Sequence, residues 1–417
     1  MFIERQKSWT VELALIACCG LALGGCGGDN DGVPSSSNSS GAPGSSRGTS
    51  NTVAVIVDSG PLEAGGAVNE PFVSVTLCAP ANPSNCQTID HVLVDTGSYG
   101  LRVIFSVLAP SLSESLPQRT DSNNNALVEC TGFADGYSWG PIKIVTLQIG
   151  GESVAALPMQ VIGDPAYNNL VPENCSGSGI AENTVATFGA NGVLGVGPFA
   201  QDCGGACVGN PASGVYYTCN SACQPAGVSL AQQVPNPITL FAADNNGLVL
   251  TFPQVPASGA EDLSGTLTFG VGTQPNNALG SAMAYTLNPI SGYFTTIFNG
   301  ASYPDSLLDS GSNGFFFDDS SIRQCSDGSG FYCPSSTLNL SAVNVGRNGT
   351  TGSVSFAVPN AETMIAKNPD ITAFSLGGTN GDATSFDWGL PFFFGRSVYT
   401  VIEGYSTNGG TGPYFAY

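Results

Sequence analysis

The same short signature occurs twice in this chain, and it constrains the fold more than any other feature. Residues 92–98 read VLVDTGS and residues 306–312 read SLLDSGS. In each copy a short apolar run leads an aspartate, Asp95 or Asp309, into a tight turn of a hydroxyl residue, glycine and serine. Two such units predict two similar halves, each contributing one carboxylate. Paired carboxylates support acid–base hydrolysis that needs neither a metal nor another cofactor.

The composition and the hydrophobic pattern predict an all-β protein with two lobes. The chain has 417 residues, with 55 Gly and 27 Pro but only 10% charged residues, which is typical of many short strands joined by turns. Helical signals are few and short, as at residues 229–233. We place the N-terminal lobe at residues 53–245 and the C-terminal lobe at 246–417. Strands are expected at residues 72–77, 143–149, 247–252 and 265–270.

The net charge and the single histidine exclude several classes of protein. A charge of −21 with only ten Lys and Arg argues against nucleic-acid binding, because a polyanion would be repelled. His91 is the only histidine, so a zinc site built on two histidines is impossible, and any histidine-dependent nucleophile would need this residue. Because His91 begins the strand that leads to Asp95, we assign it a structural role.

The N-terminal residues resemble a bacterial lipoprotein signal. Basic residues precede an apolar stretch, Leu13–Leu23, which is too short to span a bilayer and which runs into the sequence LGGC ending at Cys26. We therefore predict a signal peptide at residues 1–25, lipidation of Cys26 and a Gly/Ser-rich flexible tether at 26–52. The alternative is an ordinary signal peptide that contains a cysteine. Because Gly27 follows the cysteine, we expect an exported protein anchored by lipid at the outer membrane, periplasmic or surface-exposed.

The cysteine count agrees with export to an oxidising compartment. Of 13 cysteines, Cys18 and Cys19 fall in the signal peptide and Cys26 takes lipid, so ten remain and predict five disulfides. Their pairing stays open, although Cys78 with Cys86 and Cys325 with Cys333 would each close a small loop. The alternative for the four at 203–223 is a zinc site. The ten candidates are Cys78, Cys86, Cys130, Cys175, Cys203, Cys207, Cys219, Cys223, Cys325 and Cys333.

Several segments, in the right order, resemble the pepsin-like aspartic peptidases. The resemblance runs from about Pro71 to the C-terminus and implies a bilobal fold of two related β-barrel-like lobes with the active site in the cleft between them. It implies an endopeptidase (a hydrolase) in which Asp95 and Asp309 activate a water molecule, acting as a monomer on a peptide or protein. The segments are 95–103, 190–197, 229–233, 265–270, 293–298 and 388–401.

The resemblance also implies roles for the short residues of the two turns. The first hydroxyl residue of each turn would bond across the lobe interface, and the second would bond the outer carboxylate oxygen. The glycines would let each turn approach the partner aspartate closely. The residues expected to support the active site in this way are Thr96, Gly97, Ser98, Ser310, Gly311 and Ser312.

The chain departs from the family pattern at several positions. Phe133 stands where the flap hairpin normally carries a tyrosine, and Tyr137 or Trp139 could substitute for it or simply pack the hairpin. Arg102 replaces a usual tryptophan beside the first turn. In the second lobe we align Pro391 with the crossing-strand glycine and Phe392 with a common aspartate.

A third copy of the short motif is a decoy. Asp58 also precedes Ser59 and Gly60, but Pro61 follows, so we assign it to an N-terminal strand and turn. Two functions stay open for the true pair. One is an aspartic peptidase with an acidic pH optimum; the other is a catalytically weak or inactive surface lipoprotein that uses the same cleft, or its cysteine-rich loop at 203–223, to bind a peptide or protein partner.

Overall fold

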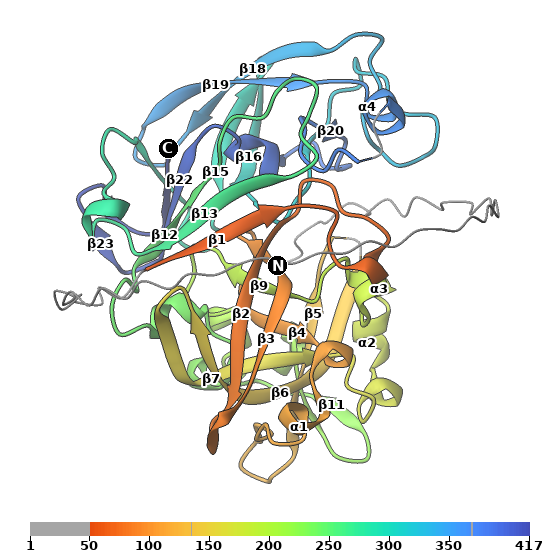
Figure 1. Ribbon diagram of the computed structural model, residues 1–417, viewed down its shortest axis with the longest axis vertical. Helices are drawn as coiled ribbons and strands as arrows, with labels where there is room; N and C mark the ends of the chain where they lie inside the picture. The colour runs from red at the N-terminus through yellow and green to blue at the C-terminus, as the bar shows by residue number, and fades with distance from the viewer. Residues whose placement is uncertain (1–50, 135, 368–369) are drawn as a thin grey trace, which may run out of the picture.

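The computed structural model describes residues 51–134, 136–367 and 370–417. These residues form two β-rich lobes, one built mainly from the first half of the chain and the other from the second half (Figure 1). The all-β, two-lobed prediction is therefore confirmed. The predicted signal peptide, Cys26 and all but the end of the predicted tether lie outside the described residues. Within the described ranges, no helix is both long and apolar enough to cross a membrane.

The first lobe is a curved antiparallel sheet into which a few parallel pairings are inserted. The predicted strand at 72–77 lies within β2, and the one at 143–149 forms the end of β6. Its strands are β2 (Pro71–Ala79), β3 (Asn82–Asp95), β4 (Tyr99–Ile104), β5 (Ala126–Gly132), β6 (Gly136–Ile149), β7 (Glu152–Ile162), β8 (Ile180–Ala181), β9 (Gly192–Val196), β10 (Tyr216–Cys219) and β11 (Cys223–Pro225).

The second lobe repeats this plan with shorter strands. The strand predicted at 293–298 is β15, and it pairs with β16, which leads to Asp309. The strands are β14 (Ala284–Thr286), β15 (Phe294–Phe298), β16 (Ala301–Leu308), β17 (Phe315–Phe317), β18 (Leu338–Val345), β19 (Thr351–Val358), β20 (Gly377–Gly378), β21 (Phe386–Trp388), β22 (Ser397–Val401), β23 (Ser406–Thr407), β24 (Gly410–Thr411) and β25 (Tyr414–Ala416).

A sheet shared by both halves connects the lobes. β1 (Thr52–Val57) runs antiparallel to β13 (Leu263–Phe269) along its whole length, and its last two residues also pair with β2. β13 in turn pairs with β12 (Gly247–Thr251), and these two strands correspond to the ones predicted at residues 265–270 and 247–252. The N-terminal strand thus lies between the lobes in Figure 1. Because the sheet is continuous through both halves, the division at residues 245 and 246 stays a prediction.

Helices are short and lie at the edges of the sheets. The α-helices are α1 (Pro110–Ser113), α2 (Glu173–Ser176), α3 (Val185–Phe188) and α4 (Ala361–Lys367). The helical signal at 229–233 corresponds to a single 3-10 turn, Leu230–Gln232, which Ser229 and Gln232 close with a capping box. Burial of strand faces, rather than helix packing, therefore supplies the core.

All ten cysteines of the described residues form disulfides, which confirms the predicted number of five. Cys78–Cys86 and Cys325–Cys333 are the two local pairs expected from the sequence. The four cysteines weighed as a zinc site instead form two disulfides of their own. The remaining bridge joins β5 to α2. The three bridges without a predicted pairing are Cys130–Cys175, Cys203–Cys207 and Cys219–Cys223.

Candidate active site

The two signature turns meet where the lobes touch. Asp95 is the last residue of β3 and Asp309 follows β16, and both side chains are buried. A Cβ atom added to Gly97 would lie 2.6 Å from Cγ of Asp309, and one added to Gly311 would lie 2.7 Å from Cγ of Asp95. No side chain fits in either gap. The turns therefore need glycine because each backbone passes directly against the opposite carboxyl group.

Reciprocal hydrogen bonds hold the two turns together. The amide of Thr96 donates to Oγ of Ser310 (3.1 Å), and the amide of Ser310 donates to Oγ1 of Thr96 (2.9 Å). Each hydroxyl then donates to a carbonyl of the other lobe: Thr96 to Leu308 at 2.9 Å and Ser310 to Val94 at 2.7 Å. Because all four bonds are buried and cross the interface, they fix the position of one aspartate relative to the other.

Each carboxylate is also bound by its own turn. The inner oxygen, Oδ1, accepts the amide of the turn glycine, Gly97 for Asp95 (2.7 Å) and Gly311 for Asp309 (2.8 Å). The outer oxygen, Oδ2, accepts the hydroxyl of Ser98 in the first turn and of Ser312 in the second. The two sites are therefore matched atom for atom. The structure brings together all eight residues that the sequence assigned to the pair.

Burial and mutual repulsion set the protonation of this pair. Burial raises the pKa of Asp309 well above the ordinary value of a carboxylic acid, and the charge of Asp95 and a hydrogen bond to it raise this pKa further. Two carboxyl groups in contact do not both ionise readily, so they titrate as a coupled pair. The pair therefore holds one proton in acidic solution, with Asp309 as the member favoured to carry it.

A crossing strand lies beside each aspartate, and the structure corrects one sequence assignment here. In the first lobe, β9 runs parallel to β3 and places Gly195 opposite Asp95. In the second lobe, β21 runs parallel to β16 with Leu308 opposite Trp388, which places Gly389 beside Asp309. The crossing-strand glycine is thus Gly389, not Pro391.

The alignment was wrong by two residues because Pro391 and Phe392 belong to a 3-10 turn after the strand. That turn, Leu390–Phe393, is completely buried. Proline suits the first turn of a helix, where no amide donor is required. The ring of Phe392 packs edge-on against Tyr417 at 4.9 Å between ring centroids. The second crossing strand is therefore regular.

The β5–β6 hairpin carries the three aromatic residues considered for a flap, and their rings are engaged in packing. Phe133 lies edge-on to Phe188 with ring centroids 5.5 Å apart. Trp139 is fully buried, packs against Tyr217, and donates from Nε1 to the carbonyl of Tyr167 at 3.1 Å. Tyr137 joins the same buried cluster as Trp139. The two proposed substitutes thus pack the hairpin, and a flap role for any of the three stays a prediction.

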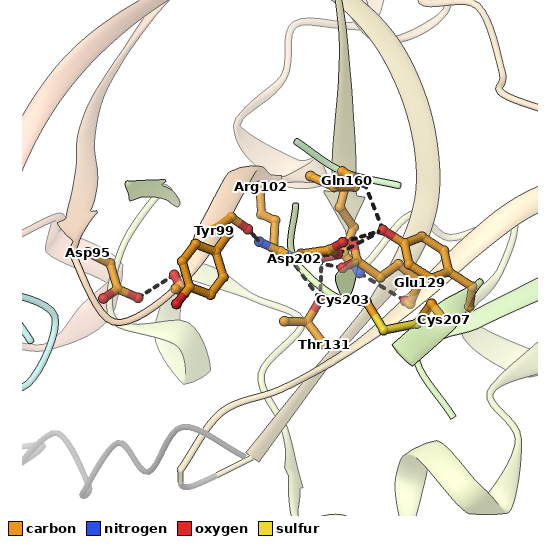
Figure 2. Close-up of polar contacts among 12 residues, drawn as sticks. Asp95, Tyr99, Arg102, Glu129, Thr131, Gln160, Asp202, Cys203 and Cys207 are labelled. Atoms are coloured by element: carbon orange, nitrogen blue, oxygen red, sulfur yellow. Dashed lines mark hydrogen bonds and ion pairs between the residues drawn. A yellow bond between two sulfur atoms is a disulfide. The ribbon is translucent and has the colours of Figure 1, made fainter. Parts of the chain in front are cut away.

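Tyr99 and Arg102 follow the first aspartate along β4, and both are buried (Figure 2). Burial raises the pKa of the Tyr99 phenol, and the neighbouring Tyr293 and Asp95 raise it further, so its hydroxyl stays neutral. Sequence reasoning missed Tyr99 because a lone tyrosine after a turn carries no signal of its own. The side chain of Arg102 points toward Glu129 and Asp202 within the first lobe and contacts both.

The decoy aspartate, Asp58, and the single histidine, His91, contact each other. Oδ1 of Asp58 accepts the amide of Gly60 at 2.9 Å, which closes the turn after β1. Nε2 of His91 lies 3.3 Å from Oδ2 of Asp58. Asp58 therefore lies in a turn after a strand, as predicted, and the contact of His91 with Asp58 is consistent with the structural role predicted for this histidine.

One group of described residues has the ligand atoms needed to bind a metal. It consists of Cys325, Cys333 and Glu362. Both sulfurs are joined in a disulfide and offer no thiolate. This group therefore does not form a metal centre in this state.

Comparison with known proteins supports the fold. A family model described as "Protein of unknown function (DUF3443)" matches residues 47–417. Among solved structures, the chain is similar to the aspartic proteinase from Irpex lacteus, with a TM-score of 0.52 and 15% identity over 88% of this chain and 96% of that chain. No curated protein matches the sequence. The chain therefore has the bilobal pepsin-like fold.

Proposed function

This chain belongs to the DUF3443 family, and we propose that it is an aspartic-type endopeptidase that hydrolyses peptide bonds with a water molecule activated between Asp95 and Asp309. One observation carries this proposal. The reciprocal bonds between Thr96 and Ser310 hold two buried carboxyl groups in contact, each bound by its own glycine amide and serine hydroxyl. A fold that needed these aspartates only to form turns would not require them to face each other.

The chemistry follows from one proton shared by the pair. The ionised carboxylate takes a proton from water, and the water oxygen attacks the carbonyl carbon of the peptide bond. The protonated carboxyl, for which Asp309 is favoured, donates to the carbonyl oxygen. When the tetrahedral intermediate collapses, the C–N bond breaks and a proton passes to the leaving nitrogen. No covalent intermediate with the protein forms.

We also propose that the protein is exported and held at the outer membrane by lipid on Cys26. Five disulfides support an oxidising compartment, and the LGGC sequence supports lipidation. The substrate would be a peptide or protein that reaches the lobe interface, and the enzyme would act as a monomer.

Cleavage of a denatured protein by the purified chain between about pH 3 and pH 6 tests the activity. We expect cleavage that Asp95→Asn and Asp309→Asn each reduce by about 10²-fold or more, and that a statine-type inhibitor blocks. Asp58→Asn is the matched control, because it changes an Asp-Ser-Gly turn that has no partner aspartate, and it should retain activity. A folded protein that cleaves nothing over this range would favour the alternative, a non-catalytic lipoprotein that binds a peptide or protein.

A further inference from the structure

We infer that Arg102 is a positioning residue for the proposed peptidase site, because it joins the strand that leaves the Asp95 turn to the β5–β6 hairpin. The inference rests on the proposed function in that it assigns the residue a role in the same site. It adds an element that the paired aspartates do not predict.

The guanidinium of Arg102 contacts three separate segments of the first lobe (Figure 2). Nη1 donates to the carbonyl of Tyr99, at the start of its own strand. Two residues of β5 also bind the guanidinium: Nε donates to Oγ1 of Thr131 at 2.9 Å, and Nη2 lies 2.5 Å from Oε1 of Glu129. Nη2 also lies 3.2 Å from Oδ2 of Asp202, which follows the crossing strand β9. One side chain therefore fixes β4, β5 and the segment after β9 to each other.

The hairpin that Arg102 holds is braced along both edges. β5 pairs with β10 on one side, and the start of β6 pairs with β8 on the other. The disulfide Cys130–Cys175 ties β5 to α2. Arg102 contacts Glu129 and Thr131 toward the end of β5, so its bonds help to set where this end of the hairpin lies relative to the Asp95 turn.

The groups around the guanidinium of Arg102 favour arginine over lysine. The groups that face it are Glu129 from β5 and Asp202 from the loop, and Tyr216 from β10 donates its hydroxyl to both carboxylate oxygens of Asp202. Gln160 on β7 donates to the carbonyl of Glu129, which completes the surroundings with a neutral group. A lysine would bring the same charge but only a single point of contact, and it would lose the fork that reaches β4 and β5 at once.

The cluster around Arg102 includes a buried carboxyl group, Asp202, whose pKa is raised. Burial raises the pKa of Asp202 well above its ordinary value, and the charge of Glu129 raises it further. Asp202 is therefore favoured to keep its proton in acidic solution, beside the guanidinium of Arg102.

Hydrogen exchange of the purified full chain, measured together with peptide cleavage, tests this role. In Arg102→Lys we expect amides of residues 99–104 and 126–132 to exchange at least about tenfold faster, because local opening becomes easier. We expect kcat to fall about ten- to a hundredfold with a smaller change in KM, since misplacement affects geometry more than binding. Arg323→Lys is the matched control: Nε of Arg323 donates to the carbonyl of Cys333 in the second lobe, and its loss should leave both readouts within about twofold.

A milder variant covers the case in which Arg102→Lys does not fold. Thr131→Val removes the hydroxyl that accepts from Nε of Arg102 and donates to Oε1 of Gln160 at 3.2 Å. It should speed exchange in the same two segments by a few fold. Unchanged exchange in both variants, or faster exchange spread over both lobes, would overturn the inference. The exchange result does not depend on catalysis, so a chain that cleaves no substrate would refute the proposed function and still report whether Arg102 couples the segments.

Discussion

The two lobes present the same turn but support it with opposite chemistry. In the first lobe, Arg102 on β4 pairs with Val193 of the crossing strand and directs its charge to Glu129 and Asp202. Phe316 on β17 holds the equivalent place in the second lobe, where it pairs with Asp387 of the crossing strand. It packs among apolar residues that include Phe331 and the Cys325–Cys333 bridge. One turn therefore rests on buried ions and the other on apolar packing.

This difference shows that the residues that bind the two carboxylates and the residues that pack behind the turns are subject to different constraints. The atoms that bind the carboxylates are matched, because both aspartates must meet at one point. The supporting residues need only fill space and satisfy their own polar groups. A buried ion cluster requires every charge to be paired, whereas an apolar cluster requires only volume. The contribution of the Arg102 cluster to stability should therefore depend on pH, whereas that of the apolar cluster around Phe316 should not.

The crossing-strand glycines lie against backbone in both lobes, so replacing them is expected to have a larger effect than changing either supporting cluster. A Cβ on Gly389 would lie 2.1 Å from the carbonyl oxygen of Gly314, and a Cβ on Gly195 would lie 2.5 Å from the amide nitrogen of Tyr99. Because these contacts are to backbone, we expect Gly389→Ala and Gly195→Ala to lower the free energy of unfolding by about 3 kcal/mol or more.

Urea unfolding measures these two variants against Gly205→Ala, which meets no atom within 4 Å and should change stability by less than about 0.5 kcal/mol. If Gly389→Ala proved as stable as this control, the strand register beside Asp309 would be wrong.

The pH dependence of stability should separate the two supports next. The raised pKa values of Asp202 and Asp309 mean that the folded protein keeps protons that the unfolded chain releases above about pH 4. Stability is therefore fully present below that pH and is lost as the pH rises toward the folded pKa values. Each such proton costs about 1.4 kcal/mol per pH unit.

Asparagine does not titrate, so Asp202→Asn removes the contribution of this one proton to the pH dependence. The unfolding free energy of the variant should therefore fall less steeply than that of the natural protein between about pH 4 and pH 7. Urea titrations at a series of pH values give both slopes. Parallel curves would show that Asp202 is not protonated in the folded state.

A change in the second support should be smaller and independent of pH. Phe316→Leu removes part of a buried ring without creating an unpaired polar group, so we expect a loss of about 1–2 kcal/mol, the same in acidic and in neutral solution. The same urea titrations measure it. A loss that grows with pH would mean that the apolar cluster is coupled to a titrating group.

The smallest effect is expected at the decoy aspartate. Asp58 and His91 form a partly exposed pair, and such pairs contribute little. Asp58→Asn should change the unfolding free energy by less than about 0.5 kcal/mol. Thermal unfolding near neutral pH is sufficient to detect a larger change, which would show that this contact between β1 and β3 supports the shared sheet more than its exposure suggests.

Sequence patterns were most informative where chemistry leaves few choices. Asp95 and Asp309 with their hydroxyl and glycine neighbours could be assigned because only short residues fit a turn that faces another carboxyl group. The local disulfides could be expected because each closes a small loop. The alignment failed at Pro391, where an apolar stretch offers no landmark and a shift of two residues preserves its pattern.

The sequence pattern did not predict contacts between residues that lie far apart along the chain. In the sequence, Arg102 stands out only as a departure from the family pattern, because its partners Glu129 and Asp202 lie far from it along the chain. The bridge Cys130–Cys175 was not paired in advance for the same reason. Nothing local distinguishes a buried glutamate from an exposed one when its counter-charge arrives from another strand.

The sequence by itself determined the all-β class, the number of disulfides and the two turns, because strand alternation, cysteine count and turn geometry are local properties. Only the tertiary structure decided that the two carboxyl groups meet, that β1 joins the lobes, that Gly389 flanks Asp309, and that a buried ion cluster braces the hairpin. These depend on which distant segments pack together, and packing is set by the whole chain rather than by any window of it.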